Sequence, residues 1–163
     1  MYAVWLIPST NDRILLEKII FNLAEKYNSP KFTPHITTYG LNSVPLDELE
    51  HIVSNSIKDM KSFDVSTLNI DYSDDIWKTL FINIQMNSNL ETIFKNLHKQ
   101  LGNTFHYDYS PHLSLIYKKI SDKEKKFLSI NLKILDKFRI NKIAIQEFFP
   151  DITKWKLVKE IQF

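Results

Sequence analysis

Two short stretches of the sequence repeat one pattern of side chains that could do chemistry. KFTPHITTYG spans residues 31–40 and DYSPHLSLIY spans residues 108–117. Each contains an aromatic residue, a hydroxyl residue, proline, histidine, an aliphatic residue and a second hydroxyl residue, in that order. The histidines are His35 and His112, 77 positions apart (112 − 35), and the hydroxyls two positions later belong to Thr37 and Ser114. The repetition predicts that both copies serve one site.

Each histidine should share a strand face with its hydroxyl residue, because side chains i and i+2 of a strand point the same way. Histidine titrates near neutral pH, so that one imidazole can accept a proton while the other donates one. The two hydroxyls can donate hydrogen bonds to the oxygens of a bound anion. This set predicts phosphodiester cleavage, with His35 and His112 moving protons and Thr37 and Ser114 holding the phosphoryl group. The pattern assigns neither histidine as the base.

The elements that position these motifs repeat as well. Apolar periodicity predicts the order β-α-β-α-β twice. The expected strands cover 2–8, 35–39, 63–72, 79–86, 112–117, 138–148 and 155–163, and the expected helices cover about 12–28, 46–60 and 90–101, with a short one after Ser121. Gly102 should end the third helix, and Ser121 with Glu124 forms a capping box for the fourth. We therefore expect one domain, 1–163, with two lobes (1–72 and 78–163) related by a pseudo-twofold axis.

The composition limits the classes of protein to consider. The chain has 163 residues, 44% of them hydrophobic and 25% charged, which is ordinary for a globular domain with a real core. A net charge of +2 tolerates an anionic ligand but does not indicate wrapping by nucleic acid. The absence of cysteine excludes disulfides and thiolate chemistry. The N-terminal apolar run is short and lacks a positive region before it, so we expect a cytosolic protein without membrane contact.

The duplicated motifs carry a resemblance to a known family. PHIT (34–37) and PHLS (111–114) resemble the two H-x-[ST] motifs of the 2H phosphoesterase superfamily. The opening YAVWLIPS, the stretch SPHLSLIY and the closing strand after Trp155 are most similar to its cyclic phosphodiesterase branch. The resemblance covers essentially the whole chain. It implies a bilobal α+β fold in which two antiparallel sheets form a central cleft and the helices lie outside.

The resemblance also implies an activity. His35, Thr37, His112 and Ser114 would form the catalytic tetrad of an enzyme that needs no metal and no cofactor. The substrate would be a cyclic phosphate, such as a nucleoside 2′,3′-cyclic phosphate or ADP-ribose 1″,2″-cyclic phosphate. We expect a monomer that acts on a small nucleotide or an oligonucleotide.

Four aromatic residues are candidates for substrate contacts. The family suggests this role for Tyr117, yet its odd offset from His112 turns it away from the cleft unless the strand ends or bulges first. Tyr39 lies at an even offset from His35 and should face the cleft. Trp5 and Trp77 are candidates for lining it.

Other functions remain open at this level. Some 2H enzymes cleave 2′,5′-oligonucleotides, cyclic oligonucleotide signals or RNA ends, and they would show the same tetrad. A non-catalytic module that only binds a nucleotide or an RNA end is a second alternative, although a pure binder would not need both imidazoles. A scaffold with an unrelated protein partner is the third.

Overall fold

The computed structural model describes residues 1–102 and 109–163, and within them seven strands alternate with four helices. The strands are β1 (Tyr2–Pro8), β2 (Ile36–Asn42), β3 (Phe63–Tyr72), β4 (Leu80–Ile84), β5 (His112–Ile116), β6 (Lys137–Glu147) and β7 (Lys156–Gln162). The helices are α1 (Thr10–Tyr27), α2 (Leu46–Ser56), α3 (Ser88–Leu101) and α4 (Asp122–Asn131), and two single 3₁₀ turns are η1 (Ile76–Lys78) and η2 (Ile152–Lys154). Every expected element is present, and the α+β class is confirmed.

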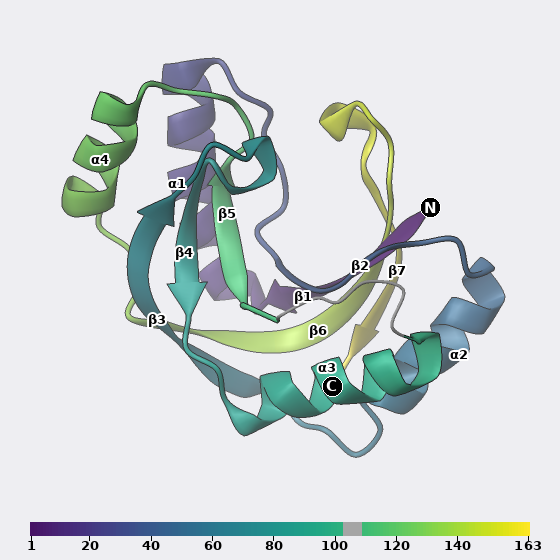
Figure 1. Cartoon of the computed structure of the whole chain (residues 1–163). Coiled ribbons are helices and arrows are strands. Elements are labelled where there is room, and N and C mark those ends of the chain that lie inside the picture. Colours follow the sequence, from purple (N-terminus) through teal and green to yellow (C-terminus); the bar gives the residue numbers. More distant parts are fainter. Residues whose placement is uncertain (103–108) are drawn as a thin grey trace.

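The strands form a curved antiparallel sheet around which the helices lie (Figure 1). The strand order is β1-β2-β5-β4-β3-β6-β7, and β1 also pairs with β6. The two expected sheets are therefore continuous, because the long strand β6 pairs with β3 through its first residues and with β1 and β7 through the rest. The two motif strands, β2 and β5, are direct neighbours in this sheet.

Local sequence signals set the ends of the helices. Ser9 accepts a hydrogen bond from the Asp12 amide at the start of α1, and an N-cap of this kind satisfies a donor that the helix leaves free. At α4 the Ser121 hydroxyl accepts the Glu124 amide and donates to the Glu124 carboxylate, so the start of this helix lies where the sequence predicted it. Gly102 ends α3 with φ of 76°, a conformation that glycine adopts without strain.

The core explains which strand faces remain available for a site. Val4 and Leu6 of β1 pack with the buried side chains of α1 and β2, whereas Ala3, Trp5 and Ile7 point to the opposite face. This is the period of two that a strand imposes. Ile36 and Leu113 are fully buried on the helix side, as expected from their places between the polar residues of the motifs.

The helices pack over the outer face of the sheet. α1 contacts β1 and β5, and α3 contacts β2 and α2. None of the helices in residues 1–102 and 109–163 combines the length and the apolar character needed to cross a membrane.

Candidate functional site

The first histidine, His35, lies immediately before β2, and the backbone sets the orientation of its ring. The Nδ1 atom of His35 is 2.7 Å from the carbonyl oxygen of Thr33. A carbonyl only accepts hydrogen bonds, so Nδ1 carries the proton and Nε2 is the unprotonated atom through which the ring can act as acid or base. Nε2 is 3.4 Å from the hydroxyl oxygen of Tyr117.

The second histidine repeats this arrangement 77 positions later. The Nδ1 atom of His112 is 2.9 Å from the carbonyl oxygen of Ser110, and Ser110 is the counterpart of Thr33 (110 − 33 = 77). The same reasoning leaves Nε2 of His112 as the free acid–base atom. The proline between carbonyl and histidine in each copy limits the backbone to the extended path that this contact requires.

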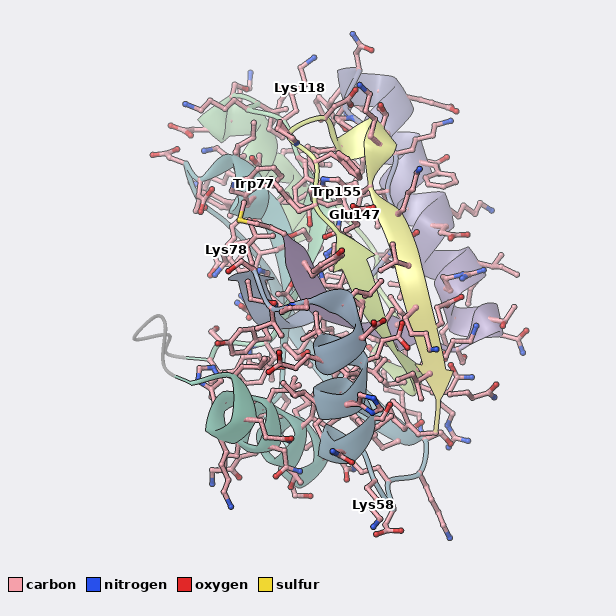
Figure 2. The ribbon with its side chains drawn as sticks, turned by 90° about the vertical axis from the view of Figure 1, so that its right-hand side faces the viewer. Lys58, Trp77, Lys78, Lys118, Glu147 and Trp155 are labelled. Carbon is pink, nitrogen blue, oxygen red and sulfur yellow. The ribbon has the colours of Figure 1, made fainter. Side chains whose placement is uncertain are left out.

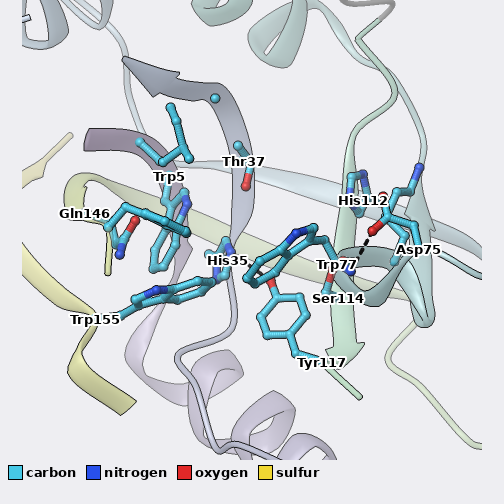
Figure 3. A pocket seen from close by; sticks show the side chains of 15 residues that line it. Trp5, His35, Thr37, Asp75, Trp77, His112, Ser114, Tyr117, Gln146 and Trp155 are labelled. Carbon is cyan, nitrogen blue, oxygen red and sulfur yellow. Dashed lines mark hydrogen bonds between the residues drawn. The ribbon is translucent and has the colours of Figure 1, made fainter. Parts of the chain in front are cut away.

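The pairing of β2 with β5 brings the two motifs together. Ile36 lies opposite Leu113 in an antiparallel pair. Extending that register by one residue puts Thr37 opposite His112 and His35 opposite Ser114, all on the face away from the helices. These four side chains line one cavity of about 400 Å³ (Figure 3). The structure thus gathers the predicted tetrad at one place.

Both motif strands contain a bulge immediately after the hydroxyl residue. Val4 pairs with Tyr39 and Trp5 with Thr37, so Thr38 is an extra residue in β2. Leu80 pairs with Ile116 and Phe81 with Ser114, so Leu115 is an extra residue in β5, again 77 positions later (115 − 38). An extra residue reverses which face the following side chains take.

The bulges determine on which face of the sheet Tyr117 and Tyr39 lie. Tyr117 lines the cavity, because the bulge and the end of β5 at Ile116 turn it towards His35. The expectation for Tyr39 was wrong: its ring is buried in the core and its hydroxyl donates to the Gly102 carbonyl at 2.8 Å. Gly40, and not Tyr39, lines the cavity as the counterpart of Tyr117 (117 − 40 = 77).

All three tryptophans of the chain line the cavity. The ring of Trp5 stacks on the His35 imidazole, with centroids 3.5 Å apart and planes inclined by 11°. Trp77 and Trp155 stack near each other with centroids 5.8 Å apart, and both lie close to Tyr117. Trp5 and Trp77 were expected at the cleft. Trp155 was not, although a rare large aromatic residue before the last strand was a usable signal.

Trp77 belongs to a short loop that is tied down on both sides. Asp75 accepts the Trp77 amide at 2.9 Å, as the cap of η1. The buried ammonium of Lys125 on α4 binds the Asp74 carboxylate at 2.8 Å and the Ser73 carbonyl at 3.2 Å. The hydroxyl of Ser114 donates to the Trp77 carbonyl at 2.9 Å. These bonds hold the loop against β5, where Trp77 lines the cavity.

Burial governs the protonation of the site. It lowers the pKa of His35 to about 4, although the Thr33 carbonyl opposes the shift and nearby His112 adds to it. Burial also lowers the pKa of His112, which the Ser110 carbonyl and Asp75 raise and Lys78 lowers. Burial raises the pKa of Tyr117, so this phenol stays protonated and can donate to His35. Both imidazoles are therefore neutral at pH 7 before a ligand binds.

Sequence reasoning missed several further lining residues. Asp75, Lys78, Gln146 and Phe148 line the cavity, and none of them was selected from the sequence. The strand alternation of β6 could have placed Gln146 with the tetrad, because Ala144 and Gln146 share the face that Trp5 occupies.

The comparisons with known proteins agree with this geometry. The family model described as cyclic phosphodiesterase-like protein matches residues 1–159. The chain belongs to this family. It is thus a phosphoesterase of the 2H superfamily, and hence a hydrolase, as the duplicated motif had indicated.

Individual relatives are distant in sequence. A cyclic phosphodiesterase of Arabidopsis thaliana is 21% identical over 151 residues, covering 89% of this chain and 83% of the relative. A crystal structure of a Thermus thermophilus protein matches with a TM-score of 0.67 at 10% identity, over 99% of this chain and 96% of its own. Escherichia coli LigT in complex with 3′-AMP matches with a TM-score of 0.61 at 11% identity, over 99% and 96%.

Proposed function

We propose that the protein hydrolyses a cyclic phosphate, either a nucleoside 2′,3′-cyclic phosphate or ADP-ribose 1″,2″-cyclic phosphate, by acid–base catalysis with His35 and His112. The observation that carries the proposal is the meeting of both His-x-hydroxyl pairs in one cavity. In each pair the Nδ1 atom is engaged by a carbonyl, which leaves two Nε2 atoms for proton transfer.

The reaction follows from the chemistry of these groups. One neutral imidazole takes a proton from water, and the water oxygen forms a new bond to phosphorus. The other imidazole, protonated once the anion is bound, gives its proton to the ribose oxygen as the ring P–O bond breaks. Thr37 and Ser114 donate hydrogen bonds to the non-bridging oxygens, where negative charge must be stabilised. No step in this scheme requires a metal.

Three observations support a small nucleotide as substrate. The cavity volume of about 400 Å³ is near the lower end for small-molecule sites, and it is more suited to one nucleotide than to a long strand. The partly exposed rings of Trp77 and Trp155 offer flat surfaces on which a base can stack. LigT, which shares the fold, has been crystallised with 3′-AMP, ATP and NADP⁺. Because one chain supplies the whole cavity, we propose that the monomer is the active unit.

A turnover panel tests the proposal. Nucleoside 2′,3′-cyclic phosphates, ADP-ribose 1″,2″-cyclic phosphate, 3′,5′-cyclic nucleotides, 2′,5′-oligoadenylate and a cyclic dinucleotide are incubated with EDTA and followed by phosphorus NMR. We expect cleavage of a 2′,3′- or 1″,2″-cyclic phosphate by the wild type and none by a His35→Ala/His112→Ala double variant. Cleavage of only the oligonucleotides would favour the alternative 2H activities. Binding without any turnover would indicate the non-catalytic module.

A further inference from the structure

The two ends of the cavity differ in chemistry. Around His35 the walls are aromatic, formed by Trp5, Trp155 and Tyr117 (Figure 3). Around His112 the lining includes the charged side chains of Lys78 and Asp75, which have no role in the proposed reaction.

Lys78 is the charged residue that stands out at the His112 end. It is the one lysine or arginine among the described residues that line the cavity. Its ammonium nitrogen lies 4.6 Å from the centre of the Phe81 ring, and the same ring contacts the imidazole of His112 with centroids 5.4 Å apart. Phe81 therefore holds a cation next to one of the two histidines.

Within the described part of the chain Lys78 takes part in no salt bridge, in contrast to Lys125, whose ammonium is bound by Asp74 and Asp122. Asp75 is the one carboxylate that lines the cavity in the described residues. Its Oδ1 atom accepts the Trp77 amide, and it forms no ion pair with Lys78, although the charges of both residues act on His112. A cation in this position can bind an anionic group of the ligand.

Gly40 supplies the space that such a group needs. Its φ is not in the left-handed region, and a Cβ atom built on it would meet nothing within 4 Å. Neither backbone conformation nor packing thus requires glycine here, and glycine inside a strand weakens the strand. In the other copy the equivalent position is filled by Tyr117, whose hydroxyl contacts His35. By the same relation between the copies Gly40, which lines the cavity, belongs to the His112 side.

We propose that the His112 end of the cavity is a subsite for a second, non-reacting phosphate of the substrate, which Lys78 binds and for which Gly40 leaves room. This inference rests on the proposed function. The substrate class is then a nucleotide that carries a cyclic phosphate and at least one further phosphate, and not a bare nucleoside cyclic phosphate.

The test compares two substrates that differ only in the second phosphate. These are adenosine 2′,3′-cyclic phosphate and the same compound with a 5′-phosphate. We expect the wild type to prefer the 5′-phosphorylated compound in kcat/KM, and Lys78→Gln to reduce this preference by about 10- to 100-fold, mainly through KM. Lys58→Gln, at the lower end of the molecule and away from Lys78 (Figure 2), is the matched control and should keep the preference.

Two results would overturn the role of Lys78. An equal loss on both substrates would mean that Lys78 acts on the reacting phosphate, and no loss on either would mean that it binds no phosphate. Gly40→Leu should impair the 5′-phosphorylated substrate more than the plain one without lowering the melting temperature. An equal effect on both substrates would contradict the part assigned to Gly40.

A binding measurement separates this inference from the proposed function. If the wild type cleaves neither compound, the proposed reaction fails, but the subsite can still be judged. Calorimetry would compare adenosine 3′,5′-bisphosphate with 3′-AMP, using wild type and Lys78→Gln. Tighter binding of the bisphosphate that depends on Lys78 supports the subsite, and an unchanged ratio of affinities overturns it.

Discussion

The two copies of the motif have the same backbone and different surroundings. In both, a carbonyl two residues earlier fixes the histidine, and a bulge follows the hydroxyl residue. Yet His35 is buried beneath the ring of Trp5, whereas His112 is partly exposed beside Phe81. The local motif sets the orientation of each imidazole. The elements that pack over the ring set its burial, and burial determines how far its pKa is lowered.

The hydroxyls differ in the same way. Ser114 is buried and donates its proton to the Trp77 carbonyl. Thr37 lines the cavity and has no hydrogen bond from its hydroxyl to any described residue. A bound phosphate can therefore accept a hydrogen bond from Thr37 without breaking a bond within the protein, whereas Ser114 must first give up its hydrogen bond to the Trp77 carbonyl. The two copies thus share their backbone geometry but differ in whether the hydroxyl is already hydrogen-bonded within the protein.

Removing either imidazole should have the largest effect. Each of His35→Ala and His112→Ala should lower kcat by about 10²- to 10⁴-fold, because one proton transfer is lost in each case. The double variant should be little slower than the worse single one, since the two groups act in one step. Steady-state kinetics on the substrate identified by the panel provides the measurement. Full activity in either single variant would contradict the acid–base mechanism.

The burial of His35 should appear in the pH dependence of stability. In the unfolded chain its pKa is near 6.5, but in the folded protein it is about 4. The unfolded state therefore binds a proton first, and folding stability should fall by about 3 kcal/mol as the pH drops from 6.5 to 4. Urea unfolding at several pH values measures this.

His35→Phe is the matched control for that measurement, because it keeps a ring against Trp5 and removes the titration. Its stability should decline less steeply over the same pH range. His112→Phe should flatten the profile less, since His112 is the less buried imidazole. Equal flattening by both variants would contradict the difference between the two copies.

The hydroxyl comparison predicts unequal losses. Thr37→Val removes a donor that is free for the phosphate, and we expect kcat/KM to fall by about 100-fold. Ser114→Ala removes a donor that must first leave the Trp77 carbonyl, so the loss should be about 10-fold. The same kinetic assay checks both. A larger loss for Ser114→Ala than for Thr37→Val would reverse the assignment.

The bulge in the first copy gives the smallest predicted effect. The buried Thr38 hydroxyl donates to the Val4 carbonyl at 3.0 Å, which the bulge leaves near it. Thr38→Val should destabilise the protein by about 1–2 kcal/mol, because a buried acceptor loses its partner. Ser56→Ala removes a similar buried bond to the Val53 carbonyl in α2, far along the chain from either motif. Both should lower stability, but only Thr38→Val should also reduce kcat.

Much of the site could be predicted because its signals are local. The spacing of His35 to Thr37 and of His112 to Ser114 places each pair on one strand face, whatever the rest of the fold does. The duplicated order of elements likewise gave the expected helices and strands. Strand alternation could not assign a face to Tyr39 or Tyr117, because each follows a bulge. The bulge residues, Thr38 and Leu115, are of types common in regular strands, so the sequence does not indicate the bulges.

The sequence by itself determined that two histidines and two hydroxyls would be presented in the same manner, since that presentation depends on alternation and on the residue before each histidine. Only the tertiary structure decided what surrounds them. The pairing of β2 with β5 sets the register that faces the copies towards each other. The connection between the paired strands β6 and β7 brings Trp155 to the cavity, and the loop held by Lys125 brings Trp77 and Lys78. These are contacts between distant segments, and burial, charge and cavity shape depend on such contacts rather than on any short stretch of sequence.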